Sequence, residues 1–539
     1  MTENSDNRRR FLKLAGAGVT GLTAGTALTG IALAQAGGRN SVAEEMRIFD
    51  VRRFGAKGDG ATIDTAVINN AIEAAAAVGG GTVFFPAGTY ASYSIHLKSF
   101  VSLYLDSGAT IVAASTPLEG ATSGGYDAAE PQGEWEPYQD YGHNHWHNSL
   151  IWGENIHDFA IFGPGLIWGK GLSRGHPNDK DLPATDKPGV GNKAIALKNC
   201  RNVILRDFSV LAGGWFAILA TGVDNLTVDN LKIDTNRDGM DIDCCRNVRI
   251  SNCSVNSPWD DAICPKSSFA LGYARATENL TINNCYVTGD YELGSMLDGT
   301  FKRLGPEFKY RATGRIKCGT ESNGGFKNIT ISNCVFEGCR GFALETVDGA
   351  VCEDITFVGI TMRDMRNAPL FLRLGTRMRG PKGTPVGSLK RVLISNVTSY
   401  GTLPDFCSII SGVPGHRVED IKISDVYLHQ LGGGTRAMAE LMPPEKENEY
   451  PEPGMFGTLP ARGFFLRHVK NIEMTNVEIA TELPDERPAF WLHDVEDSDF
   501  FRVTSGTPSF LLREVRDFRV FGSRRIKDVV LDGAEFRLL

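Results

Sequence analysis

Asn225-Leu-Thr-Val-Asp-Asn230 and Asn247-Val-Arg-Ile-Ser-Asn252 are two copies of one short pattern that recurs along this chain. In both copies, apolar and polar residues alternate between two polar ends. Alternation with a period of two residues is typical of a β-strand that buries one face. Further copies of the pattern begin at Asn202, Asn279, Asn328, Asp354, Arg391, Asp420 and Asn471. The pattern therefore predicts that much of the chain is built from short strands.

The spacing of the copies gives the length of the repeat. The copies at Asn202, Asn225 and Asn247 begin 23 and 22 residues apart, and the larger gaps are about two repeats long or contain insertions. A repeat of this length, whose unit is a strand rich in Ile and Val, predicts a solenoid. The rival solenoid, a leucine-rich repeat, needs a Leu-dominated consensus with helical segments. We therefore predict an all-β fold, a single-stranded right-handed parallel β-helix.

A solenoid needs capped ends, because open terminal coils expose strand edges and core. Residues 65–78 form an Ala-rich amphipathic segment, which predicts an N-terminal helical cap before a strand over 82–85. We expect one solenoid domain over 47–539. Insertions that interrupt the regular repeat are predicted to form loops that wall a groove. They lie near 116–148, 171–192, 300–313, 375–388 and 432–462.

Composition indicates a folded, soluble chain. Of its 539 residues, 42% are hydrophobic and 22% are charged, which is enough apolar material for a large core. The net charge of -8 argues against non-specific binding to nucleic acid. The chain has 11 cysteines, an odd number, and four of them follow an Asn at equivalent places in the repeat. We expect these thiols to be buried and stacked in preference to forming a disulfide framework.

The first residues have the pattern of an export signal. Arg8-Arg9-Arg10-Phe11-Leu12-Lys13 precedes a weakly apolar stretch over 14–34. This is typical of a twin-arginine signal peptide, here over 1–36. The alternative is a transmembrane anchor, for which the stretch is long enough but is interrupted by Gly and Thr. We therefore predict an interaction with the twin-arginine (Tat) export machinery, a periplasmic or secreted location, and no membrane attachment of the mature form.

Acidic residues gather at one point of the repeat. Asp238 and Asp260 are 22 residues apart, and Asp261 follows directly. Because 22 residues is the local repeat, we expect Asp238 and Asp260 to stack on adjacent coils, roughly 4.8 Å apart at the backbone. Crowding raises the pKa of one carboxyl and leaves another ionised, which supplies the acid and base that glycosidic hydrolysis needs. The alternative role, capping of tight turns, is our expectation for Asp241 and Asp243.

A basic strand follows downstream at Arg315-Ile316-Lys317. On a strand, Arg315 and Lys317 point to one side and Ile316 to the other, so two cations would be exposed while the Ile enters the core. Cations beside an aspartate cluster predict a binding site for a sugar carboxylate, because the guanidinium of Arg can donate two parallel hydrogen bonds to a carboxylate. The alternative is a solvated basic strand that pairs with nearby acids.

These motifs together resemble those of glycoside hydrolase family 28, the polygalacturonases and rhamnogalacturonases. The resemblance runs from Phe49-Asp-Val-Arg-Arg-Phe-Gly-Ala-Lys-Gly-Asp-Gly60 to at least Ala350. The N-T-D motif of that family corresponds to Asn236-Arg237-Asp238, its double aspartate to Asp260-Asp261, and its R-I-K motif is intact at 315–317. The resemblance implies a pectin-lyase-like solenoid that hydrolyses a pectin-like acidic polysaccharide with inversion.

The resemblance also implies roles for individual residues. Asp260 would be the general acid, and Asp238 and Asp261 would position and deprotonate the water. Arg315 and Lys317 would bind the substrate beside the scissile bond.

Two departures from the family pattern bear on the site. The family's G-H-G histidine should fall within 288–295, which contains no His, as in members that cleave rhamnogalacturonan. We expect Glu292 or Tyr291 to take its place at the substrate. Arg237 stands where the family has Thr. We expect it to pair with Asp238, to lower the pKa of that carboxyl and to favour a base role for it.

A histidine-rich segment, Tyr141-Gly-His-Asn-His-Trp-His-Asn148, lies in the first large insertion. Alternate histidines can bind a metal, but we favour polar groups of a loop in which His145 and Trp146 line a sugar subsite. We predict no metal and no cofactor.

Two other functions stay open. A pectate-type lyase also uses a parallel β-helix but needs a calcium site and a base that removes a C5 proton. A non-catalytic solenoid adhesin would use the aspartates only as turn caps. The intact R-I-K motif and the spaced aspartates favour the hydrolase, acting on galacturonan or on rhamnogalacturonan. Loops near 116–148 and 432–462 are expected to close one end of the groove, which would give exo action.

Overall fold

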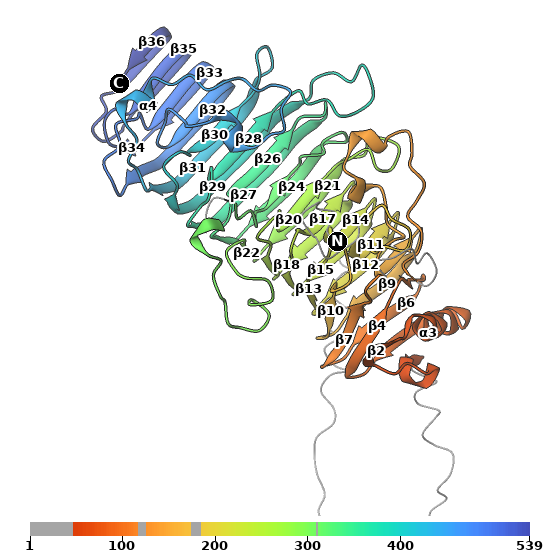
Figure 1. The fold of residues 1–539 in the computed structure, drawn as a ribbon. Helices are drawn as coiled ribbons and strands as arrows, with labels where there is room; N and C mark the ends of the chain where they lie inside the picture. The colour runs from red at the N-terminus through yellow and green to blue at the C-terminus, as the bar shows by residue number, and fades with distance from the viewer. Residues whose placement is uncertain (1–46, 117–124, 174–184, 309–310) are drawn as a thin grey trace, which may run out of the picture. The chain divides into compact units, whose positions relative to one another are not determined.

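Strand β15 (Asp224–Asp229) pairs in parallel with β12 (Arg201–Arg206) on one side and with β18 (Arg246–Ser251) on the other. These strands contain the repeated pattern, and their apolar residues face inward. Asn225 adopts a left-handed backbone with φ of 56°, and its side-chain amide donates to Asn202 Oδ1 at 2.9 Å. The repeat therefore forms coils that stack strand on strand, as Figure 1 shows.

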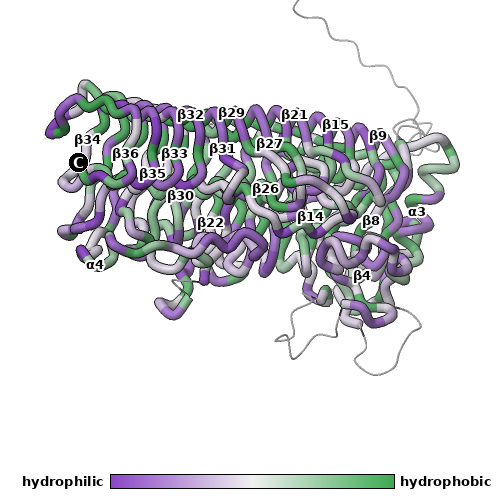
Figure 2. The backbone as a smooth tube through the Cα atoms, turned by 90° about the horizontal axis from the view of Figure 1, so that it is seen from above, coloured by the Kyte–Doolittle hydropathy of each residue, from purple (hydrophilic) through white to green (hydrophobic). Residues whose placement is uncertain are grey.

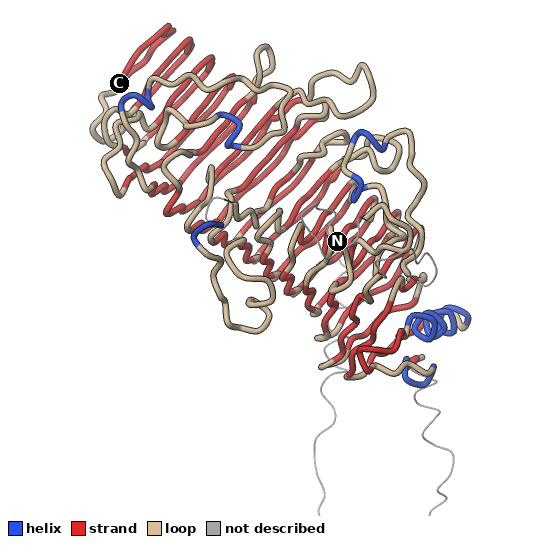
Figure 3. Tube along the Cα trace, in the orientation of Figure 1, coloured by secondary structure: helices blue, strands red, loops and turns tan. Residues whose placement is uncertain are grey.

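The computed structural model describes residues 47–116, 125–173, 185–308 and 311–539. The predicted signal peptide over 1–36 lies outside these residues. Within the described ranges, no helix is long and apolar enough to cross a membrane. Figure 3 shows that strands dominate and that helices are short and few. The predicted all-β parallel β-helix is thus confirmed.

The strands of the described residues fall into two sheets. The smaller one carries the candidate site and consists of β5 (Ile95–His96), β8 (Ile151–Glu154), β11 (Lys193–Lys198), β14 (Phe216–Thr221), β17 (Asp238–Asp243) and β20 (Ile263–Lys266). The larger sheet continues through all coils. Its other strands in the first half are β1 (Ile48–Asp50), β2 (Asp59–Ile63), β3 (Gly81–Phe85), β4 (Gly88–Ser92), β6 (Val101–Leu105), β7 (Ala109–Ala113), β9 (His157–Phe162), β10 (Leu166–Trp168), β13 (Ser209–Leu211), β16 (Lys232–Asp234) and β19 (Ser254–Asn256). Those in the second half are β21 (Thr277–Asn283), β22 (Tyr286–Thr288), β23 (Lys317–Cys318), β24 (Phe326–Ser332), β25 (Val335–Glu337), β26 (Phe342–Thr346), β27 (Val351–Arg363), β28 (Leu370–Leu374), β29 (Ser388–Thr402), β30 (Ser408–Ser411), β31 (Val418–Gln430), β32 (Phe464–Thr481), β33 (Phe490–Phe501), β34 (Thr504–Ser505), β35 (Phe510–Phe521) and β36 (Val529–Leu538).

The core lies inside the coils. All 11 cysteines are buried and free, as predicted. Cys253, Cys285 and Cys334 directly precede β19, β22 and β25, which pair in register, so their thiols stack on successive coils. Figure 2 shows hydrophilic residues recurring along one edge of the coils, near the labels β9, β15, β21, β29 and β32.

Both ends of the solenoid are covered. Helix α3 (Thr65–Ala77) lies where the cap was predicted, and its buried face, which includes Ile68 and Ile72, joins the main core. At the other end, β36 pairs antiparallel with β35. All other strand pairs of the described residues are parallel. The antiparallel partner ends the stack, because the next coil would require another parallel strand.

Short helices lie in the described parts of three of the five predicted insertions, those over 116–148, 300–313 and 432–462. The segment over 116–148 contains η2 (Glu136–Tyr138) and η3 (Tyr141–His143). The segment over 432–462 contains α4 (Arg436–Ala439) and η5 (Pro453–Phe456). Two more short 3-10 helices are η1 (Val51–Phe54) and η4 (Pro306–Phe308).

Candidate active site

Asp238 opens β17, and Asp261 lies on the adjacent coil, just before β20. The register pairs Met240 with Ile263, a step of 23 residues, and the Gly239 amide donates to the Asp261 carbonyl at 2.9 Å. The predicted stacking of Asp238 on Asp260 is therefore wrong by one residue. Asp261 stacks on Asp238, while Asp260 precedes it in the turn.

The three aspartates differ in exposure. Asp238 and Asp261 are 3% and 1% exposed, whereas the Asp260 side chain retains 29% of its exposure. Asp260 is thus the member of the trio that solvent, or a substrate, can reach directly. Trp259, the residue before it, is exposed as well.

Arg315 and Lys317 lie on the next coil, beside Asp261. Arg315 Nε donates to Asp261 Oδ1 at 2.8 Å, and Lys317 Nζ lies 2.5 Å from Asp261 Oδ2. Ile316 enters the core as predicted. The predicted exposure of the two cations is wrong, because both are almost fully buried. Their first partner is a carboxylate of the protein, which compensates the cost of burying them.

Arg237 pairs with Asp260 rather than lowering the pKa of Asp238. Its Nη2 lies 3.1 Å from Asp260 Oδ2, and its guanidinium lies 4.7 Å from the centre of the Trp215 ring. Burial, followed by the charges of Asp260 and Asp241, raises the pKa of Asp238 well above its usual value. The expected lowering is therefore wrong, since the charge of Arg237 is directed at the neighbouring aspartate.

The remaining two aspartates are held ionised. Burial acts to raise the pKa of Asp260, but Arg237 and a hydrogen bond from Asp238 contribute to a net lowering. Burial also acts to raise the pKa of Asp261, but the charges of Lys317 and Arg315, which both contact it, hold this pKa far below its usual value. The site thus separates one carboxyl that keeps its proton, Asp238, from two that lose theirs.

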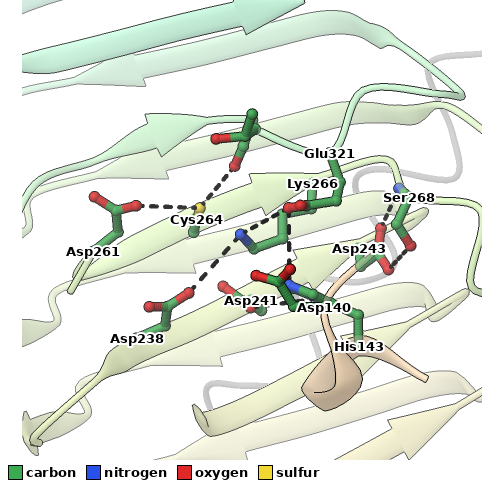
Figure 4. A network of polar contacts seen from close by, with 12 residues as sticks. Asp140, His143, Asp238, Asp241, Asp243, Asp261, Cys264, Lys266, Ser268 and Glu321 are labelled. Carbon is green, nitrogen blue, oxygen red and sulfur yellow. Dashed lines mark hydrogen bonds and ion pairs between the residues drawn. The ribbon is translucent and has the colours of Figure 1, made fainter. Parts of the chain in front are cut away.

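A network of buried charges underlies this trio, as Figure 4 shows. Lys266 Nζ lies 3.9 Å from Asp238 Oδ2 and 3.3 Å from Glu321 Oε2. His143, from the loop over 116–148, lies 3.9 Å from Asp241 Oδ2 and 3.8 Å from Glu321 Oε2. Sequence reasoning missed all of these contacts, because their residues come from three distant segments.

Asp241 and Asp243 differ from each other in role. Asp243 accepts hydrogen bonds from the Ser268 amide at 2.7 Å and from the Ser268 hydroxyl at 2.5 Å, as expected of a turn cap. Asp241 is fully buried, and neither of its oxygens has a hydrogen-bond donor among the described residues. Burial raises the pKa of Asp241 to about 7. The expected capping role is wrong for Asp241, which belongs to the charge network.

Asp238, Asp241 and Cys264 bring their ligand atoms within 4.8 Å of one another, close enough to hold a metal ion. Lys266 Nζ, however, already places a positive charge beside Asp238. Burial raises the pKa of the Cys264 thiol well above its usual value, which disfavours the thiolate that binds metals. The geometry therefore fits a lysine ammonium better than a metal ion.

The loop over 432–462 reaches the same place from far along the chain. Glu452 forms an ion pair with Arg315 and another with Arg340 at 2.9 Å. The Tyr450 hydroxyl lies 3.4 Å from Lys317 Nζ. The sequence predicted that this loop walls the groove, which stays a prediction, but did not indicate either residue.

Tyr291 and Glu292 lie apart from the aspartate trio. The Tyr291 hydroxyl lies 3.4 Å from Glu337 Oε2 and 3.4 Å from the Tyr286 hydroxyl. Its backbone binds the Asn256 side chain. Glu292 is exposed. Among the described residues, no hydrogen bond or ion pair joins either side chain to Asp238, Asp260 or Asp261, so their predicted place at the substrate stays a prediction.

His145 and Trp146 are buried supports of their loop. Trp146 is 2% exposed, packs against Phe216 and Leu219, and donates from its indole to the Thr221 hydroxyl at 3.0 Å. His145 donates from Nδ1 to the Tyr141 carbonyl at 2.8 Å and stacks on the Tyr141 ring. Both side chains are almost fully buried, and their role in lining a sugar subsite stays a prediction.

Two sequence families match parts of the chain. Residues 48–146 match the family described as rhamnogalacturonase A/epimerase, pectate lyase-like. Residues 189–300 match the right handed beta helix region. A probable polygalacturonase from Vitis vinifera is 24% identical over 414 residues, which covers 67% of this chain and 77% of the relative.

Two solved structures share the fold. An exopolygalacturonase from Yersinia enterocolitica superposes with a TM-score of 0.61 at 19% identity, over 84% of this chain and 78% of that one. A hyperthermoactive exopolygalacturonase from Thermotoga maritima gives a TM-score of 0.58 at 18% identity, over 80% of this chain and 92% of that one. The chain resembles the polygalacturonases. Similarity at this level of identity shows the common β-helix, and the predicted resemblance is confirmed.

Proposed function

We propose that this polygalacturonase-like protein hydrolyses glycosidic bonds of a pectin-like acidic polysaccharide or oligosaccharide. The observation that carries the proposal is the division of protonation states within one cluster. Asp238 is held protonated, while Asp260 and Asp261 are held ionised. A glycoside hydrolase needs one carboxylic acid and one carboxylate at the scissile bond.

The expected role of Asp260 as the acid needs a source for its proton. Asp260 is the exposed member of the trio, so it is the one placed to meet the leaving-group oxygen. Asp238, whose pKa is raised by burial and by the charge of Asp260, is its electrostatic partner and holds the proton. We assign the acid function to this pair: the proton held by Asp238 passes to Asp260 and from there to the leaving oxygen as the glycosidic bond breaks.

Asp261 supplies the base. Its pKa is lowered by Lys317 and Arg315, so it stays a carboxylate over the whole neutral and mildly acidic range. It would orient a water molecule, accept one of its protons and direct the oxygen to the anomeric carbon. Attack on the face opposite to the leaving group inverts that carbon. The buried position of Asp261 keeps it in one orientation.

The test of the proposed function is product analysis with polygalacturonan and with a rhamnogalacturonan backbone. Saturated products would support hydrolysis, and the anomer formed first, followed by NMR, would report inversion. Unsaturated products would instead show a pectate-type lyase. Products of the rhamnogalacturonan backbone alone would favour the second candidate, a rhamnogalacturonan hydrolase, which the missing histidine in 288–295 and the match of residues 48–146 favour.

We further propose that the protein is exported through the Tat machinery and acts in the periplasm or outside the cell. The basis is the twin-arginine pattern at 8–13. Replacing Arg8 and Arg9 by Lys should leave the protein in the cytoplasmic fraction. Unchanged export of that variant would overturn the proposal.

A further inference from the structure

Arg315 does not lie open beside the aspartates. Its side chain is 1% exposed, and its two partnered nitrogens are taken by carboxylates of the protein. Nε binds Asp261 at 2.8 Å, and Nη2 binds Glu452. The carboxylate of a uronate could bind this guanidinium in a bidentate manner only by displacing one of these two carboxylates.

Glu452 also binds a second cation. Its Oε1 lies 2.9 Å from Arg340 Nη1, so one carboxylate bridges two guanidinium groups. This geometry is what a sugar carboxylate would adopt between the same two arginines, because paired arginines bind a carboxylate through charge-assisted hydrogen bonds. Glu452 retains 24% of its exposure, so it lies at the boundary between the buried ion pairs and the groove.

We propose that Glu452 is a specificity residue that takes the place of a substrate carboxylate, so that the sugar bound beside Arg315 is a neutral one. This inference rests on the proposed function and deepens it. A substrate with a carboxylate at this position would bring a third negative group against Asp261 and Glu452, and like charges at such distances oppose binding.

The other groups at this position suit a neutral sugar. Arg315 Nη1 is buried and has no hydrogen-bond acceptor among the described residues. A sugar hydroxyl can accept from it without adding charge. Tyr450, two residues before Glu452, keeps half of its surface exposed. An aromatic ring of this kind packs against the C–H face of a sugar. Together with the acidic substrate of the proposed function, a neutral sugar at this position indicates a chain that contains both neutral and acidic sugars, such as one in which they alternate.

The test compares Glu452→Gln with the wild type and with Glu449→Gln. Glu449 lies on the same loop, but its side chain is 60% exposed and pairs only loosely with Lys446, at 3.6 Å. Each protein is assayed on polygalacturonan, which carries a carboxylate on every sugar, and on a rhamnogalacturonan backbone, in which acidic and neutral sugars alternate. A thermal melt of each variant checks that it is folded.

We expect the wild type to prefer the alternating backbone. Glu452→Gln should raise kcat/KM on polygalacturonan by roughly tenfold or more, because the variant removes the charge repulsion that opposes binding of an acidic sugar. Glu449→Gln should behave as the wild type. A wild type that cleaves polygalacturonan as fast as the alternating backbone would overturn the inference, whether or not the variant folds.

A binding measurement separates this inference from the proposed function. Calorimetric titration with tri-galacturonate needs no catalysis, and Glu452→Gln should bind it about tenfold more tightly than the wild type. If neither polymer is cleaved but this gain appears, the proposed function fails and the specificity role of Glu452 stands. If hydrolysis is seen but Glu452→Gln gains no affinity for the acidic trimer, the specificity role fails alone.

Discussion

Lys317 Nζ and Asp261 Oδ2 lie 2.5 Å apart with both side chains almost completely buried. An ion pair so far from water persists only because further contacts compensate both charges, and Arg315 supplies one of them at 2.8 Å. The relationship explains why Asp261 is ionised while Asp238, directly opposite it on the neighbouring coil, is not. The arginine and lysine of the R-I-K motif thus contact a buried carboxylate of the candidate site first.

Removing the charge of Asp261 should weaken the fold as well as activity. Asp261→Asn leaves Arg315 and Lys317 without their shared carboxylate, and breaking a buried pair in this way typically costs about 3–5 kcal/mol. Chemical denaturation at pH 7 measures the loss of unfolding free energy. Because the folded pKa of Asp261 is lowered, its stabilising effect is present above the ordinary value of 3.8 and fades only as the pH falls towards the lower folded value. An Asp261→Asn protein as stable as the wild type at pH 7 would contradict this account of the pair.

Asp238→Asn should show the opposite dependence of stability on pH. The folded pKa of Asp238 is raised, so its contribution to stability is greatest below the ordinary pKa of 3.8 and is lost as the pH rises through the folded value. The neutral amide avoids this loss. We expect melting temperatures of the variant, relative to the wild type, to increase between pH 4 and pH 8 while activity is lost. A variant whose melting temperature stays constant or falls relative to the wild type between pH 4 and pH 8 would show that Asp238 is ionised in the folded protein.

The alkaline limb of the activity profile should report the proton of Asp238 and its neighbours. Asp241, whose pKa is raised to about 7 by burial, adds negative charge beside Asp238 as it ionises. Asp241→Asn removes that charge, so the pKa of Asp238 should fall and the alkaline limb of kcat/KM should move to lower pH. Asp243→Asn serves as the control, since Asp243 is occupied as a cap of Ser268. An alkaline limb that stays in place in Asp241→Asn would separate Asp241 from the proton that catalysis uses.

Arg237→Ala should change the pH dependence of activity, through the pKa of Asp260, rather than the stability of the fold. Arg237 lowers the pKa of Asp260, so its loss should raise that pKa and move the alkaline limb of kcat/KM, which reports the proton of the Asp238–Asp260 pair, to higher pH. We expect Arg237→Lys to retain part of the wild-type pH profile, because lysine keeps the positive charge but lacks the bidentate guanidinium group. Identical alkaline limbs in all three proteins would show that the 3.1 Å pair between Arg237 and Asp260 has no catalytic role.

The fold could be predicted from sequence because its cause is local and repeated. The alternation in 225–230 and 247–252 needs only neighbours one coil away, and the Asn at each turn repeats its left-handed backbone. The helix over 65–77 likewise follows from its own residues. One repeat of 23 rather than 22 residues was enough to exchange Asp260 for Asp261 in the stack, because register is fixed by the turn and not by the strand pattern.

The site could be predicted only in part. Asp238, Asp260, Asp261, Arg315 and Lys317 come together because they occupy successive coils. Glu452 and His143 reach the site from loops more than 90 residues away from Asp238, and nothing periodic in the sequence locates a loop. The burial of Arg315, Lys317 and Trp146 was missed for the same reason, since the covering segments are insertions.

The most direct test of the central claim is mass spectrometry of the products that the signal-free protein forms from polygalacturonan and from a rhamnogalacturonan backbone, beside an Asp260→Asn control. The account predicts saturated products from the wild type and a rate lower by about 10²–10⁴-fold in the control, the usual contribution of a general acid. Unsaturated products, or an Asp260→Asn protein as active as the wild type, would contradict it.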